Sequence, residues 1–424
     1  MVRIFWWGLC CWALSTATPV HAQSLAMSAY VQQVERAAVS LQLAEQNTRV
    51  AEGHAAASGR WADPQLSVGL APESVAVPGL DTGAVVGLSQ ALPWPQTLRS
   101  ERARAQAKLV EQQAVQRQQE LMLQLQARQA YAQWWYVHQA IAANAEQQQL
   151  LADLLQAARG AYSSGATMSQ ARLLRLGLRL TQREQQALDL EAQRKALAGH
   201  MNALRNQAVD HPLPPPSGLP QLPALPATEQ LRAALVHAHP QLAGLQARAE
   251  AAEHAQDLAR RNYRPDFRLQ LQYLQTLPRE ENRTQVGLSF NVPLGQEKRD
   301  GALRAARAQR YAAELAEEDA LNQLLAELSA VLAQERAAER SVALLRSSAL
   351  PMAEDALQAA RAAFMSGQGD LQAVLDAEAD RIEVVLDLAR SRAQHCQQRF
   401  ALAQLTAGRW EEQLWNEGSE EGRP

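Results

Sequence analysis

Apolar and polar residues alternate in four short segments of the chain, with one interruption at Gln90. In the clearest of them, Phe267, Leu269, Leu271 and Tyr273 occupy every second position, and polar residues lie between them. The other three segments with alternating apolar residues fall within 66–70, 86–92 and 286–292. Alternation with a period of two predicts β-strands that have one apolar and one polar face.

Long stretches around these segments are rich in Ala, Leu, Gln, Arg and Glu, a composition that favours extended helices with a narrow apolar stripe. Helices are predicted at about 28–60, 96–162, 168–208, 228–262, 297–364 and 370–408. A helix of about 65 residues is roughly 100 Å long, which a compact domain does not need. We therefore expect antiparallel helical hairpins that reverse at Gly165 and Gly367.

The chain also carries an internal repeat of about 200 residues. The tetrapeptide Val-Gly-Leu-Ser, followed by a proline, occurs at 86–93 and again at 286–293. Two similar octapeptides that end in Ser-Gly occupy 158–165 and 360–367. The same order of motifs at nearly constant spacing indicates a duplicated helix-strand-strand-long helix hairpin unit.

Five regions follow from this pattern. We predict a signal peptide at 1–22, a first repeat at 23–211, a proline-rich linker at 212–227, a second repeat at 228–409 and a flexible acidic tail at 410–424. The first region has Arg3, an apolar stretch and a small-residue cleavage site that ends at Ala22, as secretory signals do. Its two cysteines do not match a lipid-attachment site, so the exported chain is not expected to be a lipoprotein.

Composition narrows the function further. Positive and negative charges nearly balance, with 41 Lys and Arg against 44 Asp and Glu, so no nucleic-acid partner is expected. The sequence has no catalytic motif, no phosphate-binding loop and no cysteine pair of the CxxC type, so we expect neither an enzyme nor a cofactor. His237 and His239 are two positions apart and do not share a helix face, so no metal site is expected there.

The pattern of the strands indicates a membrane location. Segments of about 8–10 residues with one apolar and one polar face are typical of transmembrane β-barrels. The alternative is a half-buried sheet of a soluble protein. Four strands cannot close a barrel, and open strand edges are not tolerated in lipid, so several copies are expected to contribute strands to one wall.

On these features the chain resembles the TolC-like outer-membrane factor family, over essentially the whole mature sequence. The tip motif Phe364-x-x-Gly367, followed by Val374-Leu375-Asp376-Ala377, belongs to the resemblance. The resemblance implies a homotrimer in outer-membrane lipid, with a 12-stranded barrel continuous with a periplasmic α-helical tunnel. It also implies two partners, a periplasmic adaptor (membrane fusion protein) and an inner-membrane pump of the RND type.

Within the family, segments 63–66 and 87–95 are most similar to the CusC/CzcC-type members that accompany heavy-metal exporters. A drug-efflux channel or a type I secretion channel remains an alternative. A periplasmic coiled-coil adaptor or scaffold is a more remote one, since an adaptor has one helical hairpin flanked by soluble β-domains.

The resemblance also implies the site residues. Asp376, Phe364 and Tyr162 are expected at the periplasmic entrance, and Gly165 and Gly367 at the hairpin tips that dock the adaptor. Well-studied members close this entrance with a Tyr, an Arg and two acids, whereas here the corresponding positions hold Phe364, Gly369, Ala373 and Asp376. Asp376 is therefore expected to form a pore-facing acidic ring, and the alternative is a solvated helix carboxylate like that of Asp380.

Overall fold

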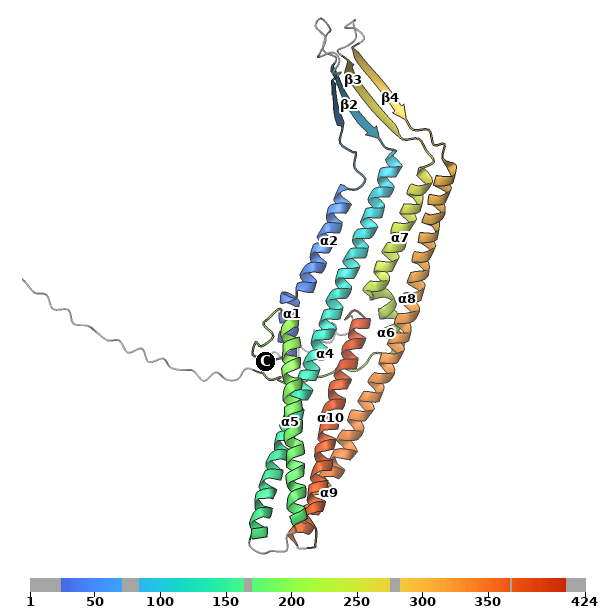
Figure 1. Ribbon diagram of the computed structural model, residues 1–424. Helices are drawn as coiled ribbons and strands as arrows, with labels where there is room; N and C mark the ends of the chain where they lie inside the picture. The colour runs from blue at the N-terminus through green and yellow to red at the C-terminus, as the bar shows by residue number, and fades with distance from the viewer. Residues whose placement is uncertain (1–23, 71–83, 164–169, 275–282, 367, 409–424) are drawn as a thin grey trace, which may run out of the picture.

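The computed structural model describes residues 24–70, 84–163, 170–274, 283–366 and 368–408. The molecule is elongated, with a small β-sheet at one end and helices that run from it to the opposite end (Figure 1). The predicted hairpin ends at 165 and 367 lie outside the described residues.

The two halves of the chain contain the same elements in the same order. The first half has α1 (Met27–Ala37), α2 (Val39–Ala57), β1 (Gln65–Leu70), β2 (Ala84–Leu92), α4 (Pro95–Ser163) and α5 (Gln170–Leu204). The second half has α6 (Thr228–Ala238), α7 (Pro240–Arg261), β3 (Phe267–Leu274), β4 (Thr284–Phe290), α8 (Gln296–Leu344), a π-helical turn η2 (Leu345–Ala349), α9 (Leu350–Met365) and α10 (Leu371–Leu405). The predicted duplicated, mainly α fold with a small set of strands is confirmed.

The first helix of each half is broken. The sequence indicates a turn at His239-Pro240, whereas the break at Ala38 was missed by the prediction of a helix over 28–60. The breaks occur at Ala38 and His239, which both have extended backbone angles between two helices. Pro240 explains the second break, because a proline forces the residue before it out of the helical region. Its ring nitrogen also cannot donate a hydrogen bond, and the His239 side chain instead accepts one from the Gln241 amide at 3.3 Å.

Proline also sets two other boundaries. The long helical stretch at 296–365 contains the π-helical turn η2 immediately before Pro351, since a proline inside a helix removes one backbone donor and displaces the preceding turn. The fourth strand ends at Phe290 and not at 292 as predicted, three residues before Pro293.

The strands form one antiparallel sheet in the order β1-β2-β3-β4. Its register places the apolar residues of neighbouring strands opposite one another, for example Leu88 opposite Leu271, and Leu271 opposite Val286. The resulting apolar face consists of Leu66, Val68, Leu70, Val86, Leu88, Leu92, Phe267, Leu269, Leu271, Tyr273, Val286, Leu288 and Phe290, interrupted by Gln90. The other face is mainly polar, with Gln65, Ser67, Ser89, Arg268, Gln270, Gln272, Gln285 and Ser289, although Val85 and Leu274 also lie on it at one end of the sheet.

The helices pack in a thin layer, and the core is divided into separate clusters along it. In the first half, Tyr30, Trp134 and Met201 join α1, α4 and α5. In the second half, Leu235, Leu328 and Leu402 join α6, α8 and α10 in the same manner. Each cluster fixes three helices to one another without requiring a globular core.

The proline-rich segment between the halves is held against the middle of the molecule by hydrogen bonds to its carbonyl groups. The Trp134 indole donates to the Pro214 carbonyl oxygen at 3.1 Å, and Arg399 donates to that of Pro223 at 2.8 Å. The Leu25 amide also donates to the Pro215 carbonyl oxygen. Because a proline-rich segment cannot form helical or sheet hydrogen bonds, its carbonyl groups need other donors such as these.

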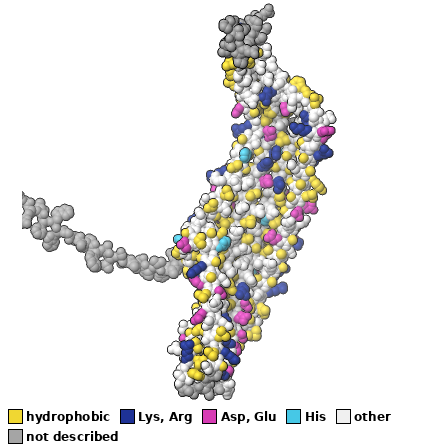
Figure 2. Space-filling model, viewed as in Figure 1, with side chains coloured by type: hydrophobic (Ala, Val, Ile, Leu, Met, Phe, Trp, Pro, Cys, Tyr) yellow, Lys and Arg dark blue, Asp and Glu magenta, His cyan; other side chains and the backbone are white. Residues whose placement is uncertain are grey.

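Hydrophobic, acidic and basic side chains are interspersed over the visible face of the helical part (Figure 2). Within the described ranges, no helix has both the length and the apolar composition needed to cross a membrane.

Candidate functional site

The predicted entrance lies at the end of the molecule opposite the sheet, where the first hairpin (α4 and α5) meets the second (α8, η2, α9 and α10) (Figure 1). Tyr162 lies in the last turn of α4 and Phe364 in the last turn of α9, and both side chains are about half exposed. The two hairpins are joined behind them by an apolar cluster that includes Leu155, Leu176 and Leu375. No ring contact links Tyr162 to Phe364 among the described residues.

Asp376, the predicted acidic ring residue, is exposed on α10 next to this cluster, and its carboxylate is engaged from two sides. Arg179 of α5 donates to Oδ1 at 2.8 Å, and Gln372 donates to both carboxylate oxygens at 2.8 and 3.0 Å. These hydrogen bonds, that of Arg179 first, hold the pKa of Asp376 below its usual value. Within one chain, the negative charge at this position is therefore partly neutralised.

A second ion pair joins the same two helices closer to the tip. Arg172 of α5 lies 3.3 Å from Asp370, the residue that precedes α10. Sequence reasoning missed both arginines, although Arg172 and Arg179 are seven residues apart and therefore lie on the same side of a helix. Asp370 and Asp376 of the second repeat have a similar spacing. The matching spacing of two arginines and two aspartates could have indicated ion pairs between the hairpins.

Gly369 also shapes this end of the molecule. Its amide donates to the Ala363 carbonyl oxygen at 2.8 Å, which closes the turn after α9. A Cβ atom at this position would lie 2.8 Å from the Phe364 nitrogen and 2.8 Å from the Ala363 carbonyl carbon. The chain therefore passes close to α9, and a side chain at this position would force the turn to shift.

Two residues after Asp376 and on another side of α10, Glu378 is buried, with 4% of its side chain exposed. It accepts from Arg361 at 3.1 Å and from Arg381 at 2.7 Å, and Arg381 also contacts Glu146 of the first hairpin at 2.8 Å. The repeat places Leu176 at the equivalent position, where it is buried in the apolar cluster. One half of the duplication thus has an ionic contact where the other has an apolar one.

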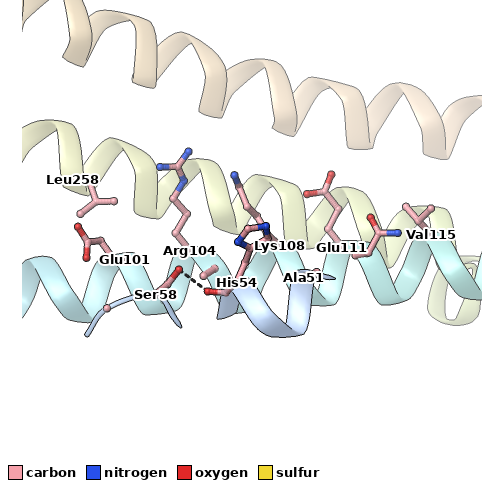
Figure 3. Close-up of a pocket in the computed structure, with 12 residues that line it drawn as sticks. Ala51, His54, Ser58, Glu101, Arg104, Lys108, Glu111, Val115 and Leu258 are labelled. Carbon is pink, nitrogen blue, oxygen red and sulfur yellow. Dashed lines mark hydrogen bonds between the residues drawn. The ribbon is translucent and has the colours of Figure 1, made fainter. Parts of the chain in front are cut away.

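A groove with a volume of about 690 Å³ lies elsewhere, between α2, α4 and α7 close to the sheet. Arg104, Lys108, Glu101 and Glu111 project into it from α4, and His54 and Ser58 approach it from α2 (Figure 3). The single hydrogen bond drawn there joins the Ser58 hydroxyl to the His54 carbonyl. Both charge signs are present, and no described group of three or more His, Cys, Asp or Glu residues could hold a metal ion.

No protein-family model matches the chain, and no curated protein matches it either. Solved structures do match. The outer membrane protein VceC from Vibrio cholerae has a TM-score of 0.76 at 18% identity, over 90% of this chain and 96% of that chain. CusC has a TM-score of 0.76 at 13% identity, over 90% and 91%.

The open state of the MtrE outer membrane channel from Neisseria gonorrhoeae has a TM-score of 0.74 at 16% identity, over 90% of this chain and 89% of that chain. Each match spans nearly the full length of both proteins, sheet and helical hairpins together. At such identities the likeness establishes the three-dimensional fold, and the fold expected from the sequence resemblance is confirmed. The chain has the fold of the TolC-like outer-membrane channels.

Proposed function

We propose that the protein is the outer-membrane exit channel of a tripartite efflux system, working as a passive duct and not as an enzyme. The observation that carries this proposal is the apolar face of the sheet. Its side chains are exposed across all four strands, up to 70% for Leu66 and 74% for Val286. An exposed apolar surface of this extent needs a non-aqueous environment, and lipid is the one that suits a sheet whose other face is polar.

The open edges of the sheet support a ring of several copies. Among the described strands, β1 and β4 each have one edge without a partner strand, and lipid does not tolerate unpaired backbone groups. The two outer helices below them also expose apolar residues, Val39 and Leu43 on α2, and Tyr311 and Leu315 on α8. Contacts between these two different edges generate a closed ring, which the family resemblance sets at three copies.

The remaining partners and the location rest on the resemblance. We propose a signal-directed chain without a lipid anchor, placed in the outer membrane with its helical end in the periplasm. There the hairpin tips around Gly165 and Gly367 dock a periplasmic adaptor, which connects to an RND-type pump that exports heavy-metal cations. CusC lies among the similar structures, but so do VceC and MtrE. The alternative, a drug-efflux or secretion role, is therefore tested beside the heavy-metal role in the experiment below.

Adjacent substitutions on the central strand β3 test the membrane-spanning sheet. Leu271→Arg places a charge on the apolar face, which costs about 2–4 kcal/mol near the middle of a membrane barrel. Gln272→Arg places the same charge on the polar face, opposite Gly87 and Gln285. We expect Leu271→Arg to abolish the heat-modifiable oligomer in outer-membrane extracts, and Gln272→Arg to retain it.

Equal amounts of oligomer from both variants would exclude the proposed orientation of the sheet. The function itself is tested by deleting the gene and measuring the minimal inhibitory concentration of a panel of divalent metals and of drugs. Sensitivity to metals alone supports the heavy-metal role, and sensitivity to drugs alone supports the alternative.

A further inference from the structure

A second groove, of about 560 Å³, lies at the junction between the helices and the sheet. It is formed by Arg60 and Trp61, which follow α2, and by Leu98, Arg99 and Arg102 in the first turns of α4. Three guanidinium groups line it, and none of its lining residues is acidic. This composition differs from that of the larger groove, where acids and bases are mixed.

The charges of these three arginines are not offset by an ion pair with any of the described residues. Within the part of the chain that the structure describes, no ion pair or hydrogen bond is recorded for Arg60, Arg99 or Arg102. Like charges held close together repel one another, so an arrangement of this kind is stabilised by an anion. The planar guanidinium group presents paired donors that match the oxygens of a phosphate.

The backbone fixes this arrangement. Gly59 has a φ of +65°, a left-handed conformation that favours glycine. A Cβ atom there would lie 2.3 Å from the Leu98 carbonyl oxygen and 2.9 Å from the Arg102 Cβ. The chain therefore crosses α4 in direct contact, and this crossing holds Arg60 and Trp61 beside the arginines of α4.

The position of the groove indicates the source of the anion. The apolar face of the sheet ends at the row formed by Leu92, Phe267 and Phe290, and Trp94 packs edge-on against Phe267 with the Arg264 guanidinium over its ring. The groove begins at the next residue, Pro95, and 59% of Trp61 is exposed. Aromatic residues at the ends of membrane strands lie at the level of the lipid headgroups.

We propose that Arg60, Arg99 and Arg102 bind the phosphate of an anionic phospholipid in the membrane leaflet next to the helices, and that Trp61 contacts its acyl chains. This inference rests on the proposed function, because it requires the apolar face of the sheet to lie in lipid. Basic pockets at membrane boundaries bind anionic headgroups through this combination of charge and an adjacent apolar surface. The bound lipid would fix the depth at which the sheet meets the helices.

The opposite side of α4 supplies a matched control. Arg99 and Lys108 are nine residues apart and therefore lie on opposite sides of the helix, and Lys108 and Arg104 line the larger groove. Removing two positive charges from either side changes the net charge equally. The double substitutions Arg99→Gln with Arg102→Gln, and Arg104→Gln with Lys108→Gln, therefore separate a local site from general electrostatic attraction.

The full-length oligomer is purified in detergent and titrated with phosphatidylglycerol, phosphatidylcholine or inorganic phosphate, and bound lipid is counted by native mass spectrometry. We expect phosphatidylglycerol to bind at least tenfold more tightly than phosphatidylcholine. The Arg99→Gln, Arg102→Gln variant should lose this preference, and the Arg104→Gln, Lys108→Gln variant should keep it. Phosphatidylglycerol with brominated acyl chains should quench part of the tryptophan fluorescence, and Trp61→Phe should remove that part.

Equal lipid preference in both double variants overturns the proposal. Inorganic phosphate binding as tightly as the lipid, without quenching at Trp61, also overturns it and places the arginines on a water-filled face. The heat-modifiable oligomer is measured for each variant separately. Its absence from the wild-type chain contradicts the proposed channel, whereas a normal oligomer without the lipid preference contradicts this inference alone.

Discussion

Arg179 and Asp376 come from different halves of the duplicated chain, and the Arg179 Nη2 atom lies 2.8 Å from the Asp376 Oδ1 atom. Together with Arg172 and Asp370 at 3.3 Å, this pair ties α5 of the first hairpin to α10 of the second near the proposed entrance. If the channel opens by separation of the two hairpins, both contacts must break. The ion pairs then favour the closed arrangement.

Substituting Arg179 tests this role. An exposed ion pair contributes about 0.2–1 kcal/mol, so three equivalent pairs in a trimer shift the balance between closed and open channels by about 0.6–3 kcal/mol. We expect Arg179→Gln to raise single-channel conductance in planar bilayers. Arg175→Gln is the control, because Arg175 lies on the same helix and forms no ion pair with the described residues. Equal conductance in both variants would show that the pair does not restrain the entrance.

The pH dependence of the entrance follows from the same contact. The pKa of Asp376 is lowered in the folded protein, by the Arg179 hydrogen bond first and that of Gln372 second. A group of this kind stabilises the closed arrangement above its unfolded pKa of about 3.9, and the contribution is lost as the pH falls through the folded value. Conductance should therefore stay constant between about pH 8 and 5 and rise only in stronger acid. A rise near pH 6 would require another titrating group.

A ring of Asp376 carboxylates should also attract cations, since like charges around a narrow opening concentrate negative potential. We expect trivalent cations added on the periplasmic side to block the channel, and Asp376→Asn to weaken that block by about tenfold. Asp380→Asn, one turn further along α10, should change it much less. The same block and cation selectivity in wild type and Asp376→Asn would favour the solvated-surface interpretation of this carboxylate.

Gly59 should be essential where the helices meet the sheet. Gly59→Ala forces a side chain into a left-handed conformation, which costs about 1–2 kcal/mol, and brings it against the Leu98 carbonyl. We expect a lower dissociation temperature of the oligomer. Gly53→Ala, within α2 and with nothing within 4 Å of the added Cβ atom, should be neutral or stabilising. A loss of stability in both variants would mean that α2 and the turn after it do not tolerate alanine generally.

The buried carboxylate of Glu335 is a further test of the packing. Its side chain is 1% exposed and lies 2.8 Å from Arg399 and 3.2 Å from His395. Removing one partner of a buried ion pair typically costs about 3–5 kcal/mol, because the other charge remains buried. Glu335→Ala should therefore lower the thermal unfolding temperature strongly, and Glu339→Ala, exposed one turn further along α8, should leave it nearly unchanged.

Local patterns were sufficient to predict the repeat and nearly all of the long helices. The two longest helical stretches were expected at 96–162 and 297–364, and they occupy 95–163 and 296–365. Helical and strand periodicities are properties of neighbouring residues, so they can be read without knowledge of the packing. The break at Ala38 was missed because a periodic pattern continues across a single extended residue, whereas Pro240 marks the break at His239 in the sequence itself.

The sequence by itself determined the strands, their two faces and the duplication, because each depends on spacing within one segment. Only the tertiary structure decided which distant residues meet. Arg179 and Asp376 are separated by 197 residues, and Arg60 and Arg99 come from different elements, so no local pattern relates them. The predicted carboxylate at the entrance could be chosen from the sequence, but its partner could not, since ion pairing between hairpins depends on how two helices lie against each other.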